Sequence, residues 1–316
     1  MAKKIIKDIN HPSHCLFTPL PFRRMGEEQK IQKTALGLFP YKGINLVRGV
    51  HHVQHLDSLE TFEIRDDDIV AVTYPRSGTT WTQYILSLLY HGDQMTEGGS
   101  TKPIQELVPF LEENIRQIDY NKPSTRTFTS HLHLSSIPQG LREKGKVIYI
   151  ARNPKDVAVS LFHLQNLTKV LKSEPDFNTF LIQFLKGEVI GGSWFDHVAD
   201  WYAHKDEFDI LSLTYEDMIK DTRGAVVRIS TFLGKKLDDQ TIDTIVDKSS
   251  FKNMKEDPQA RRDKQYPAFF EKTGSFIRKG KVGDWKTMFT VAQSERFDQI
   301  YMEKMKDVPL EFDWEL

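Results

Sequence analysis

A turn of small residues and one cation follows an apolar run in AVTYPRSGTTW, residues 71–81. Ser77, Gly78 and Thr79 offer hydroxyl and backbone N–H groups where a helix would begin, and a helix N-terminus of this kind binds anions. Arg76 adds a planar guanidinium group that suits phosphate or sulfate oxygens. The same residues also suit an ordinary capped helix start, so the turn alone leaves both interpretations open.

Two further stretches combine cations with turn-forming residues. In IARNPKDVAVS, Arg152 ends an apolar run and Ser160 lies eight residues later, so both could contact one phosphate. Taken alone, Arg152 is explained better by a surface ion pair than by phosphate binding. In FIRKGKVGDWK, residues 276–286, Arg278 and Lys279 stand beside two glycines and Trp285, a combination that favours an ordered anion-binding loop.

A pair of histidines stands in FTSHLHLSSIP, residues 128–138. His131 and His133 are two residues apart, so on a strand they face the same side and could ligate a metal or simply pack. No third cluster of ligands accompanies them. Cys15 is the only cysteine, which excludes an intramolecular disulfide framework and a cysteine-rich zinc site and fits a reducing compartment.

The elements that must position these groups alternate along the chain. Strands are predicted over 68–75, 125–132, 146–154 and 209–218, and near-continuous Val and Ile in the first and third favours parallel strands buried on both faces. Helices are predicted over 79–91, 155–165, 177–189, 194–206, 223–234 and 291–307. This order predicts a doubly wound α/β fold with a mostly parallel central sheet, as one domain over 43–316 behind an irregular N-terminal arm, 1–42.

Composition narrows the class of partner. The chain has 316 residues, 39% hydrophobic residues and a formal charge of −1, which indicates a globular protein and argues against a general nucleic-acid or anionic-membrane surface. A small molecule is the expected partner. No apolar stretch is long enough to span a bilayer, and the polar start lacks a signal-peptide pattern, so we expect a cytoplasmic protein.

Taken together, the three motifs resemble those of the cytosolic sulfotransferases, which transfer a sulfuryl group from 3′-phosphoadenosine-5′-phosphosulfate (PAPS). TYPRSGTTW resembles the 5′-phosphosulfate loop of that family, ARNPKDVAVS its 3′-phosphate segment and RKGKVGDWK its C-terminal cofactor signature. The resemblance covers nearly everything after the N-terminal arm. LETFEIRDDDI, FKNMKEDP and TVAQSERFDQIYMEKMKDVPLEF look closest to the amine sulfotransferase branch of the family.

The resemblance implies a donor site, a base and a dimer. Around the 5′-phosphosulfate and adenine it implies Arg76, Ser77, Gly78, Thr79, Thr80, Trp81, Tyr215, Ser249 and Phe251, and around the 3′-phosphate Arg152, Ser160, Arg278, Lys279 and Gly280. It implies His131 as the catalytic base, with no metal, and His133 in the wall of an acceptor pocket. KTMFTVAQSE resembles the family's dimerisation signature through Lys286, Thr290, Val291 and Glu295, which implies a homodimer.

Two positions depart from the family pattern. Arg76 and Thr129 stand where relatives usually carry lysine. Because an arginine fork prefers two oxygens and an ammonium group can settle on one, we expect PAPS binding to survive better than leaving-group stabilisation. On this argument, lysine at position 76 would match or exceed arginine in turnover. The alternative is a PAPS-binding protein with weak or no catalysis.

Another enzyme class would also place a glycine-containing loop between a strand and a helix. A P-loop nucleotide kinase is the less favoured alternative, because PRSGTTW lacks the Walker spacing and lysine. For the sulfotransferase interpretation, the expected acceptor is a small, largely apolar phenol, steroid, or aryl or alkyl amine. Candidate pocket walls are the segments 41–47, 186–198 and 265–272 with Phe128, His133 and Phe162.

Overall fold

The computed structural model describes residues 37–92, 102–113 and 124–316, which belong to the compact unit Ala35–Leu316. Most of the predicted arm, 1–42, lies outside these residues. Its last described part is ordered as strand β1 (Leu38–Tyr41), which pairs with β2 (Ile44–Val47) in an antiparallel hairpin. Lys42 and Gly43 connect the two strands and both have positive φ, as a two-residue hairpin turn requires.

The central sheet has four strands in the order β4-β3-β5-β6, and every neighbouring pair is parallel. The strands are β3 (Ile69–Thr73), β4 (Thr127–Ser130), β5 (Lys146–Ala151) and β6 (Ile210–Thr214). Each lies inside one of the four predicted strand segments. The predicted α/β fold with a mostly parallel sheet is confirmed.

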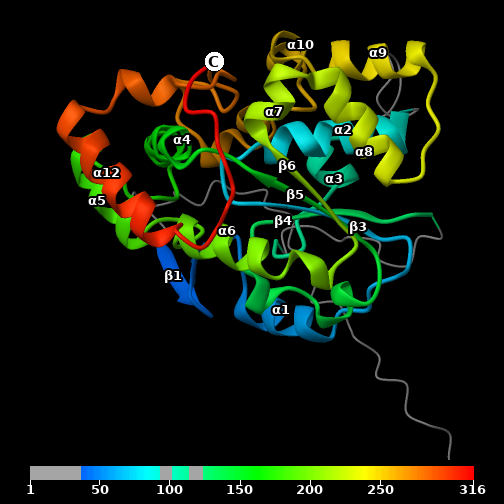
Figure 1. Ribbon diagram of the computed structural model, residues 1–316, viewed down its shortest axis with the longest axis horizontal. Helices are drawn as coiled ribbons and strands as arrows, with labels where there is room; N and C mark the ends of the chain where they lie inside the picture. Colours follow the sequence, from blue (N-terminus) through cyan, green and yellow to red (C-terminus); the bar gives the residue numbers. More distant parts are fainter. Residues whose placement is uncertain (1–36, 93–101, 114–123) are drawn as a thin grey trace, which may run out of the picture. The chain divides into compact units, whose positions relative to one another are not determined.

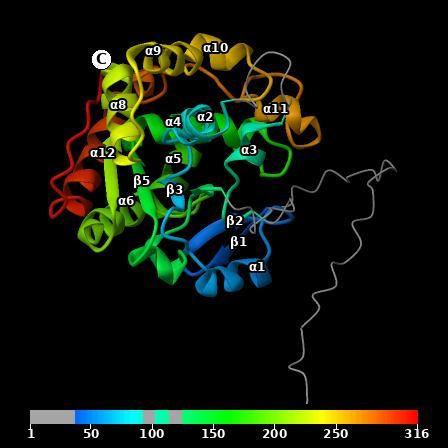
Figure 2. The same ribbon diagram turned by 90° about the vertical axis from the view of Figure 1, so that its right-hand side faces the viewer.

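Side chains alternate between two cores on opposite faces of this sheet. In β3, Ile69 and Ala71 join one core while Val70 and Val72 join the other, as the two-residue period of a strand requires. The first core includes residues of α2, α8 and α9, and the second includes residues of α4, α5, α6 and α12. In both ribbon views α8 and α9 lie on one side of the sheet and β1 and α1 on the other (Figures 1 and 2).

Helices fill the connections between the strands. The longer ones are α2 (Thr79–His91), α4 (Pro154–Leu167), α5 (Phe177–Lys186), α6 (Trp194–Ala203), α8 (Thr222–Phe232), α9 (Asp239–Lys248) and α12 (Val291–Lys304). The short ones are α1 (Val53–Ser58), α3 (Ile104–Leu107), α7 (Tyr215–Lys220), α10 (Phe251–Glu256) and α11 (Arg262–Gln265). The six predicted helices correspond to α2, α4, α5, α6, α8 and α12, whereas α9 was not predicted. Within the described ranges, no helix combines the length and the apolar character needed to cross a membrane.

Local capping explains where α4 begins, just after β5. The Asn153 side chain accepts a hydrogen bond from the Asp156 backbone N–H, and Pro154 occupies the first turn, where its missing N–H costs nothing. The helix therefore starts directly behind Arg152. This fixes the distance between the end of β5 and Ser160 on the same helix.

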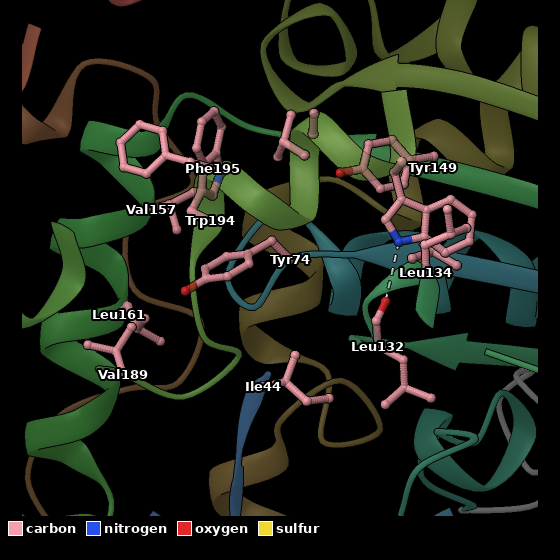
Figure 3. Packing of buried hydrophobic residues seen from close by; sticks show 14 of the residues in the cluster. Ile44, Tyr74, Leu132, Leu134, Tyr149, Val157, Leu161, Val189, Trp194 and Phe195 are labelled. Carbon is pink, nitrogen blue, oxygen red and sulfur yellow. Dashed lines mark hydrogen bonds between the residues drawn. The ribbon is translucent and has the colours of Figure 1, made fainter. Parts of the chain in front are cut away.

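Buried packing anchors the end of β3 to a glycine-containing loop. The ring of Tyr74 lies among Ile44, Val189 and Trp194 (Figure 3), and its hydroxyl donates to the Gly192 carbonyl at 2.8 Å. Nearby, the Trp201 indole N–H donates to the Leu132 carbonyl, drawn as a dashed line in Figure 3. These buried contacts hold in place the segments that follow β3 and β4.

Candidate active site

Each strand of the central sheet ends directly before a candidate functional residue. Thr73 ends β3 shortly before Arg76, and β4, β5 and β6 end immediately before His131, Arg152 and Tyr215. Because the strands are parallel, their carboxyl ends meet at one edge of the sheet, where α/β proteins bind ligands.

At this edge the structure has a cavity of about 300 Å³. Of the residues proposed from sequence for donor binding and catalysis, all but Ser77 line it: Arg76, Gly78, Thr79, Thr80, Trp81, His131, Arg152, Ser160, Tyr215, Ser249, Phe251, Arg278, Lys279 and Gly280. Ser77 is fully buried beneath the turn, and its hydroxyl has no hydrogen-bond partner among the described residues. The fold therefore gathers segments some 200 residues apart, such as Arg76 and Phe276, around one space.

The turn after β3 has the backbone of an anion-binding loop. Arg76 has a φ of 71°, a left-handed conformation that is uncommon outside glycine, and Gly78 follows with a φ of 105°. A side chain at position 78 would lie 3.1 Å from the Tyr215 ring, so only glycine fits without displacing it. Gly78 caps α2 without any side-chain hydrogen bond, which leaves the first backbone N–H groups of the helix available to an anion.

The Arg76 side chain is held by two hydrogen bonds. Its Nε donates to the Ser160 hydroxyl at 3.0 Å and its Nη2 to the Phe276 carbonyl at 3.0 Å, while the guanidinium lies over the Phe276 ring. Burial, together with the nearby charges of Arg152 and Arg278, lowers the pKa of Arg76 to about 10. Arg76 thus remains charged at neutral pH within a group of like charges that a bound anion would relieve.

Arg152 links the end of β5 to two loops. Its guanidinium donates to the carbonyls of Arg76 at 3.1 Å and Lys281 at 3.0 Å, and it lies 4.1 Å over the Tyr215 ring. Its Nε is buried and without a partner among the described residues. The Nε–H group of this arginine thus remains for a ligand.

The loop at 278–280 is shaped by glycine and by a carboxylate. Gly280 has a φ of 61°, and a Cβ there would lie 2.3 Å from the Phe251 ring, so the backbone approaches this ring as closely as glycine allows. Arg278 and Lys279 both pair with Asp284, each at 2.5 Å. The Arg278 Nε is buried and unpartnered within the described structure.

The His131 side chain is a neutral imidazole in which one ring nitrogen has no hydrogen-bond partner among the described residues. Its Nδ1 lies 2.7 Å from the Thr73 carbonyl oxygen, which can only accept, so Nδ1 carries the proton. Nε2 is then a lone-pair acceptor, and no described residue hydrogen-bonds it. Burial lowers the pKa of His131 to about 4, against the opposing effect of the Thr73 carbonyl. The imidazole is therefore uncharged at neutral pH, with its single N–H proton on Nδ1.

A buried acid that the sequence interpretation did not single out lies behind this histidine. Glu112 Oε1 accepts the His131 backbone N–H at 2.7 Å, and its other oxygen has no partner among the described residues. Burial raises the pKa of Glu112 to about 7. A charged residue inside the apolar run VPFLEE, residues 108–113, was the available signal.

His133 does not line the cavity, contrary to expectation. It is buried, its Nε2 is 3.0 Å from the Gly191 carbonyl oxygen, and its ring packs against His197. The two histidines diverge because β4 ends at Ser130, so the two-residue period of a strand does not continue through them. Within the described residues, no three His, Cys, Asp or Glu side chains form a group able to hold a metal ion.

The remaining wall is largely apolar and comes from segments outside the central sheet. The expected segments contribute Val47, Ile190, Tyr266, Phe269 and Phe270, whereas the expected Phe128 and Phe162 lie in the hydrophobic core. Polar residues that the sequence did not single out also line it: His51, Gln105, Glu113 and Arg262. Arg262 pairs with Glu113 at 2.7 Å and lies over the Phe110 ring, which also contacts His131. The polar pair is therefore separated from His131 by one aromatic ring.

Thr129 and the kinase alternative can be compared with this geometry. Thr129 is buried in β4, its hydroxyl has no partner among the described residues, and it does not line the cavity.

No lysine takes the Walker position in the turn after β3, where Arg76 is the cation. The site is thus built around arginine.

Comparison with known proteins identifies the family. The pattern described as "Sulfotransferase domain" matches residues 66–309. An amine sulfotransferase from Oryctolagus cuniculus is 46% identical over 284 residues, covering 88% of this chain and 94% of that protein. "Cytosolic sulfotransferase 1" from Danio rerio is 38% identical over 288 residues, covering 88% and 95%.

Among solved structures, mouse sulfotransferase SULT7A1 complexed with PAP, the nucleotide product of PAPS, has a TM-score of 0.72 at 34% identity, covering 86% of this chain and 95% of that one. A retinol dehydratase structure has a TM-score of 0.75 at 24% identity, covering 88% and 93%, which shows a shared fold. Strand ends that converge on an anion-binding turn, and a match over most of the chain, lead to one conclusion: the chain belongs to the sulfotransferase family.

Proposed function

We propose that this sulfotransferase transfers the sulfuryl group of PAPS to the hydroxyl or amine of a small, largely apolar acceptor, with His131 as the base. The observation that carries the proposal is the imidazole at the end of β4, whose free Nε2 belongs to the same cavity as the anion-binding turn. The PAP complex of SULT7A1 supports the choice of donor.

We call the part of the cavity lined by the turn at 76–80, Arg152 and the 278–280 loop the donor half, and the apolar part beyond His131 the acceptor half. The donor half fits PAPS because it contains buried hydrogen-bond donors that have no protein partner within the described structure. Buried polar atoms without partners among the described residues belong to side chains that line it: the Trp81 indole N–H, and Nε of Arg152 and of Arg278. Buried donors left unpaired are costly, so a ligand with several anionic oxygens explains them. We assign the turn at 76–80 to the 5′-phosphosulfate, and Arg152, Ser160 and the 278–280 loop to the 3′-phosphate.

The aromatic residues of this half complete the site. Trp81 and Tyr215 meet edge to face at 5.6 Å, and Phe251 lies against Gly280. We propose that these rings, with Ser249, bind the adenine base, because flat apolar surfaces suit a heterocycle.

Catalysis requires a proton acceptor and stabilisation of a leaving group. PAPS, when bound, supplies a sulfuryl group on a nucleotide phosphate, which leaves as an anion. His131 takes the acceptor's proton at Nε2, while the Thr73 carbonyl holds Nδ1–H and so fixes the tautomer. Arg76 and the N-terminus of α2 stabilise the negative charge that develops on the departing phosphate.

The acceptor enters the apolar half of the cavity. Its rings, among them Phe110, Phe269 and Phe270, suit an aromatic or alicyclic acceptor, as expected for conjugation of xenobiotics or hormones. The name of the rabbit relative supports including amines among the candidates.

Screening acceptors with ³⁵S-labelled PAPS tests the proposal. We expect labelled product from at least one phenol, hydroxysteroid or amine without added metal. Tight binding of PAP with no transfer to any acceptor would favour the binding-only alternative, and magnesium-dependent ATP turnover without sulfuryl transfer would favour the kinase alternative.

We further propose that the protein is a cytoplasmic homodimer that pairs through the segment 286–295. Val291 is 76% exposed at the start of α12, where a partner could contact it, and Thr290 caps the helix through a capping box. Lys286 and Glu295 complete the proposed contact. Light scattering at micromolar concentration should give the dimer mass, and Val291→Glu should give the monomer.

A further inference from the structure

The carboxylate of Asp284 holds both cations of the 278–280 loop. Arg278 Nη2 lies 2.5 Å from one oxygen of Asp284, and Lys279 Nζ lies 2.5 Å from the other. The Asp284 side chain is only 6% exposed. Although burial opposes ionisation, hydrogen bonds from Lys279 and Arg278 lower the pKa of Asp284, so it is a carboxylate at neutral pH.

The two cations face the cavity, whereas their counter-ion does not. Arg278 and Lys279 both line the cavity, and Asp284 is absent from its wall. Lys279 is 42% exposed, and Arg278 Nε remains unpartnered among the described residues. Asp284 therefore accepts hydrogen bonds from both cations without lining the cavity that an anionic ligand would enter.

Other groups fix the backbone of this loop. The Asp156 carboxylate accepts the backbone N–H of Gly283 at 2.9 Å and of Trp285 at 2.8 Å. The Trp285 indole donates to the Trp314 carbonyl at 2.7 Å. Among the described residues, the Asp284 carboxylate accepts hydrogen bonds from the two cations and a 3.5 Å hydrogen bond from the Thr287 hydroxyl. Its charge is thus not needed to shape the loop.

We propose that Asp284 is an internal counter-ion, which competes with the nucleotide 3′-phosphate for Arg278 and Lys279 and so speeds nucleotide release. The proposal rests on the assignment of these cations to the 3′-phosphate. A bound phosphate must either take donors from Asp284 or share them while lying close to a carboxylate, and both cost binding free energy. When the nucleotide leaves, the Asp284 carboxylate pairs again with Arg278 and Lys279.

A positioning role for Asp284 predicts the opposite sign. If the carboxylate mainly aims the two cations at the ligand, its removal weakens nucleotide binding. If it competes, its removal strengthens binding. The difference should depend on the 3′-phosphate, since a ligand without this group does not need the two cations.

Calorimetric titration of the full chain with PAP (adenosine 3′,5′-bisphosphate) and with adenosine 5′-monophosphate separates the two roles. We expect Asp284→Asn to bind PAP roughly threefold to thirtyfold more tightly and to release it correspondingly more slowly in stopped-flow chase, because one nearby like charge is removed under partial screening. Affinity for the monophosphate should stay within about twofold of the parent, because that ligand lacks the competing group.

Three further variants keep the test decisive. Asp298→Asn removes a carboxylate from another lysine ion pair, with Lys155 at 2.7 Å, and should leave PAP affinity unchanged. Asp284→Ser replaces Asp284→Asn if the latter does not fold, with the same expected sign. Arg278→Ala should weaken PAP far more than the monophosphate.

The outcomes distinguish the two proposals. If Arg278→Ala weakens both nucleotides equally, the assignment of the 3′-phosphate fails. If Arg278→Ala discriminates but neutral residues at position 284 weaken PAP or leave its affinity unchanged, the counter-ion role is overturned and the assignment stands.

Discussion

The two halves of the cavity are built in different ways. The donor half uses residues placed immediately after strands: Arg76 soon after β3, Arg152 after β5 and Tyr215 after β6. The acceptor half uses residues from outside the central sheet, including Val47 at the end of hairpin strand β2, Ile190 and Phe269. The edge of the central sheet fixes the first group, whereas packing outside that sheet fixes the second. The donor half is thus suited to one invariable ligand, and the acceptor half can change without disturbing the sheet.

The halves also differ in charge. Arg76, Arg152, Arg278 and Lys279 line the donor half, and the buried Nε atoms of Arg152 and Arg278 have no partner among the described residues. Aromatic side chains dominate the acceptor half, with His51, Gln105 and the Glu113–Arg262 pair among its polar groups. His131 stands between them, beside Phe110 and next to Thr73, which ends β3 before the turn at 76–80. Substitutions should therefore affect donor chemistry and acceptor binding separately.

The largest effect should come from the donor half, at Arg76. Arg76→Ala should lower turnover by about a hundredfold to a thousandfold, as expected for loss of one transition-state donor. The shape argument from sequence favoured Arg76→Lys, but the structure gives a reason for the opposite result. Lysine cannot bond the Ser160 hydroxyl and the Phe276 carbonyl as the guanidinium does.

We therefore expect Arg76→Lys to fall between Arg76→Ala and the parent. Turnover at saturating donor and acceptor, with PAP affinity measured separately, tests this order. A lysine variant faster than the parent would restore the sequence argument and show that the guanidinium contacts do not aid transfer.

An effect of intermediate size is expected in the pH dependence of turnover. His131 must be neutral to act as a base, and burial lowers its pKa to about 4, so turnover should stay level as pH falls from neutrality and decline only as the pH approaches 4. Glu112, whose pKa burial raises to about 7, is the other titrating group beside it. Glu112→Gln keeps an oxygen for the His131 N–H and removes that titration.

The pH profile of Glu112→Gln should therefore retain the same acid limb. A limb centred near the ordinary histidine pKa in both proteins would mean that the imidazole is solvated during catalysis, contrary to the structure.

The smallest effect should come from the acceptor half and concerns stability. Gln105 is 4% exposed, and neither its Oε1 nor its Nε2 has a partner among the described residues. Gln105→Leu removes this unsatisfied amide, so we expect the melting temperature to rise by about 1 to 3 °C. Gln83→Leu is the matched control, because Gln83 is equally buried but donates to the Val108 carbonyl at 2.9 Å, and its melting temperature should fall. Equal losses in both variants would show that Gln105 is satisfied by water.

The contrast between the halves also explains what could be predicted from sequence. Residues 69–73 and 146–151 are apolar runs long enough to identify as strands, and Gly78 and Pro154 mark the starts of the following helices. Donor-site candidates next to such elements could be identified because the fold places strand ends together. Their resemblance to a known family added the roles.

The rest depended on tertiary contacts that no local pattern encodes. His133 follows the end of β4, so strand periodicity gave the wrong face. Phe162 has the character of a pocket residue, but it packs against Phe177 and Phe180 of α5. Asp284 looked like part of an anion-binding motif, and only its distances to Arg278 and Lys279 reveal the competing charge.

Replacing His131 tests the central claim most directly, because this residue joins the two halves. Single-turnover transfer from ³⁵S-labelled PAPS should be measured for the parent and His131→Ala with a hydroxyl acceptor, since a neutral amine can attack before it loses its proton. We predict that the variant binds PAP within about twofold of the parent and transfers about a hundredfold to ten-thousandfold more slowly. Parent-level transfer by His131→Ala would contradict the account and remove the imidazole from the mechanism.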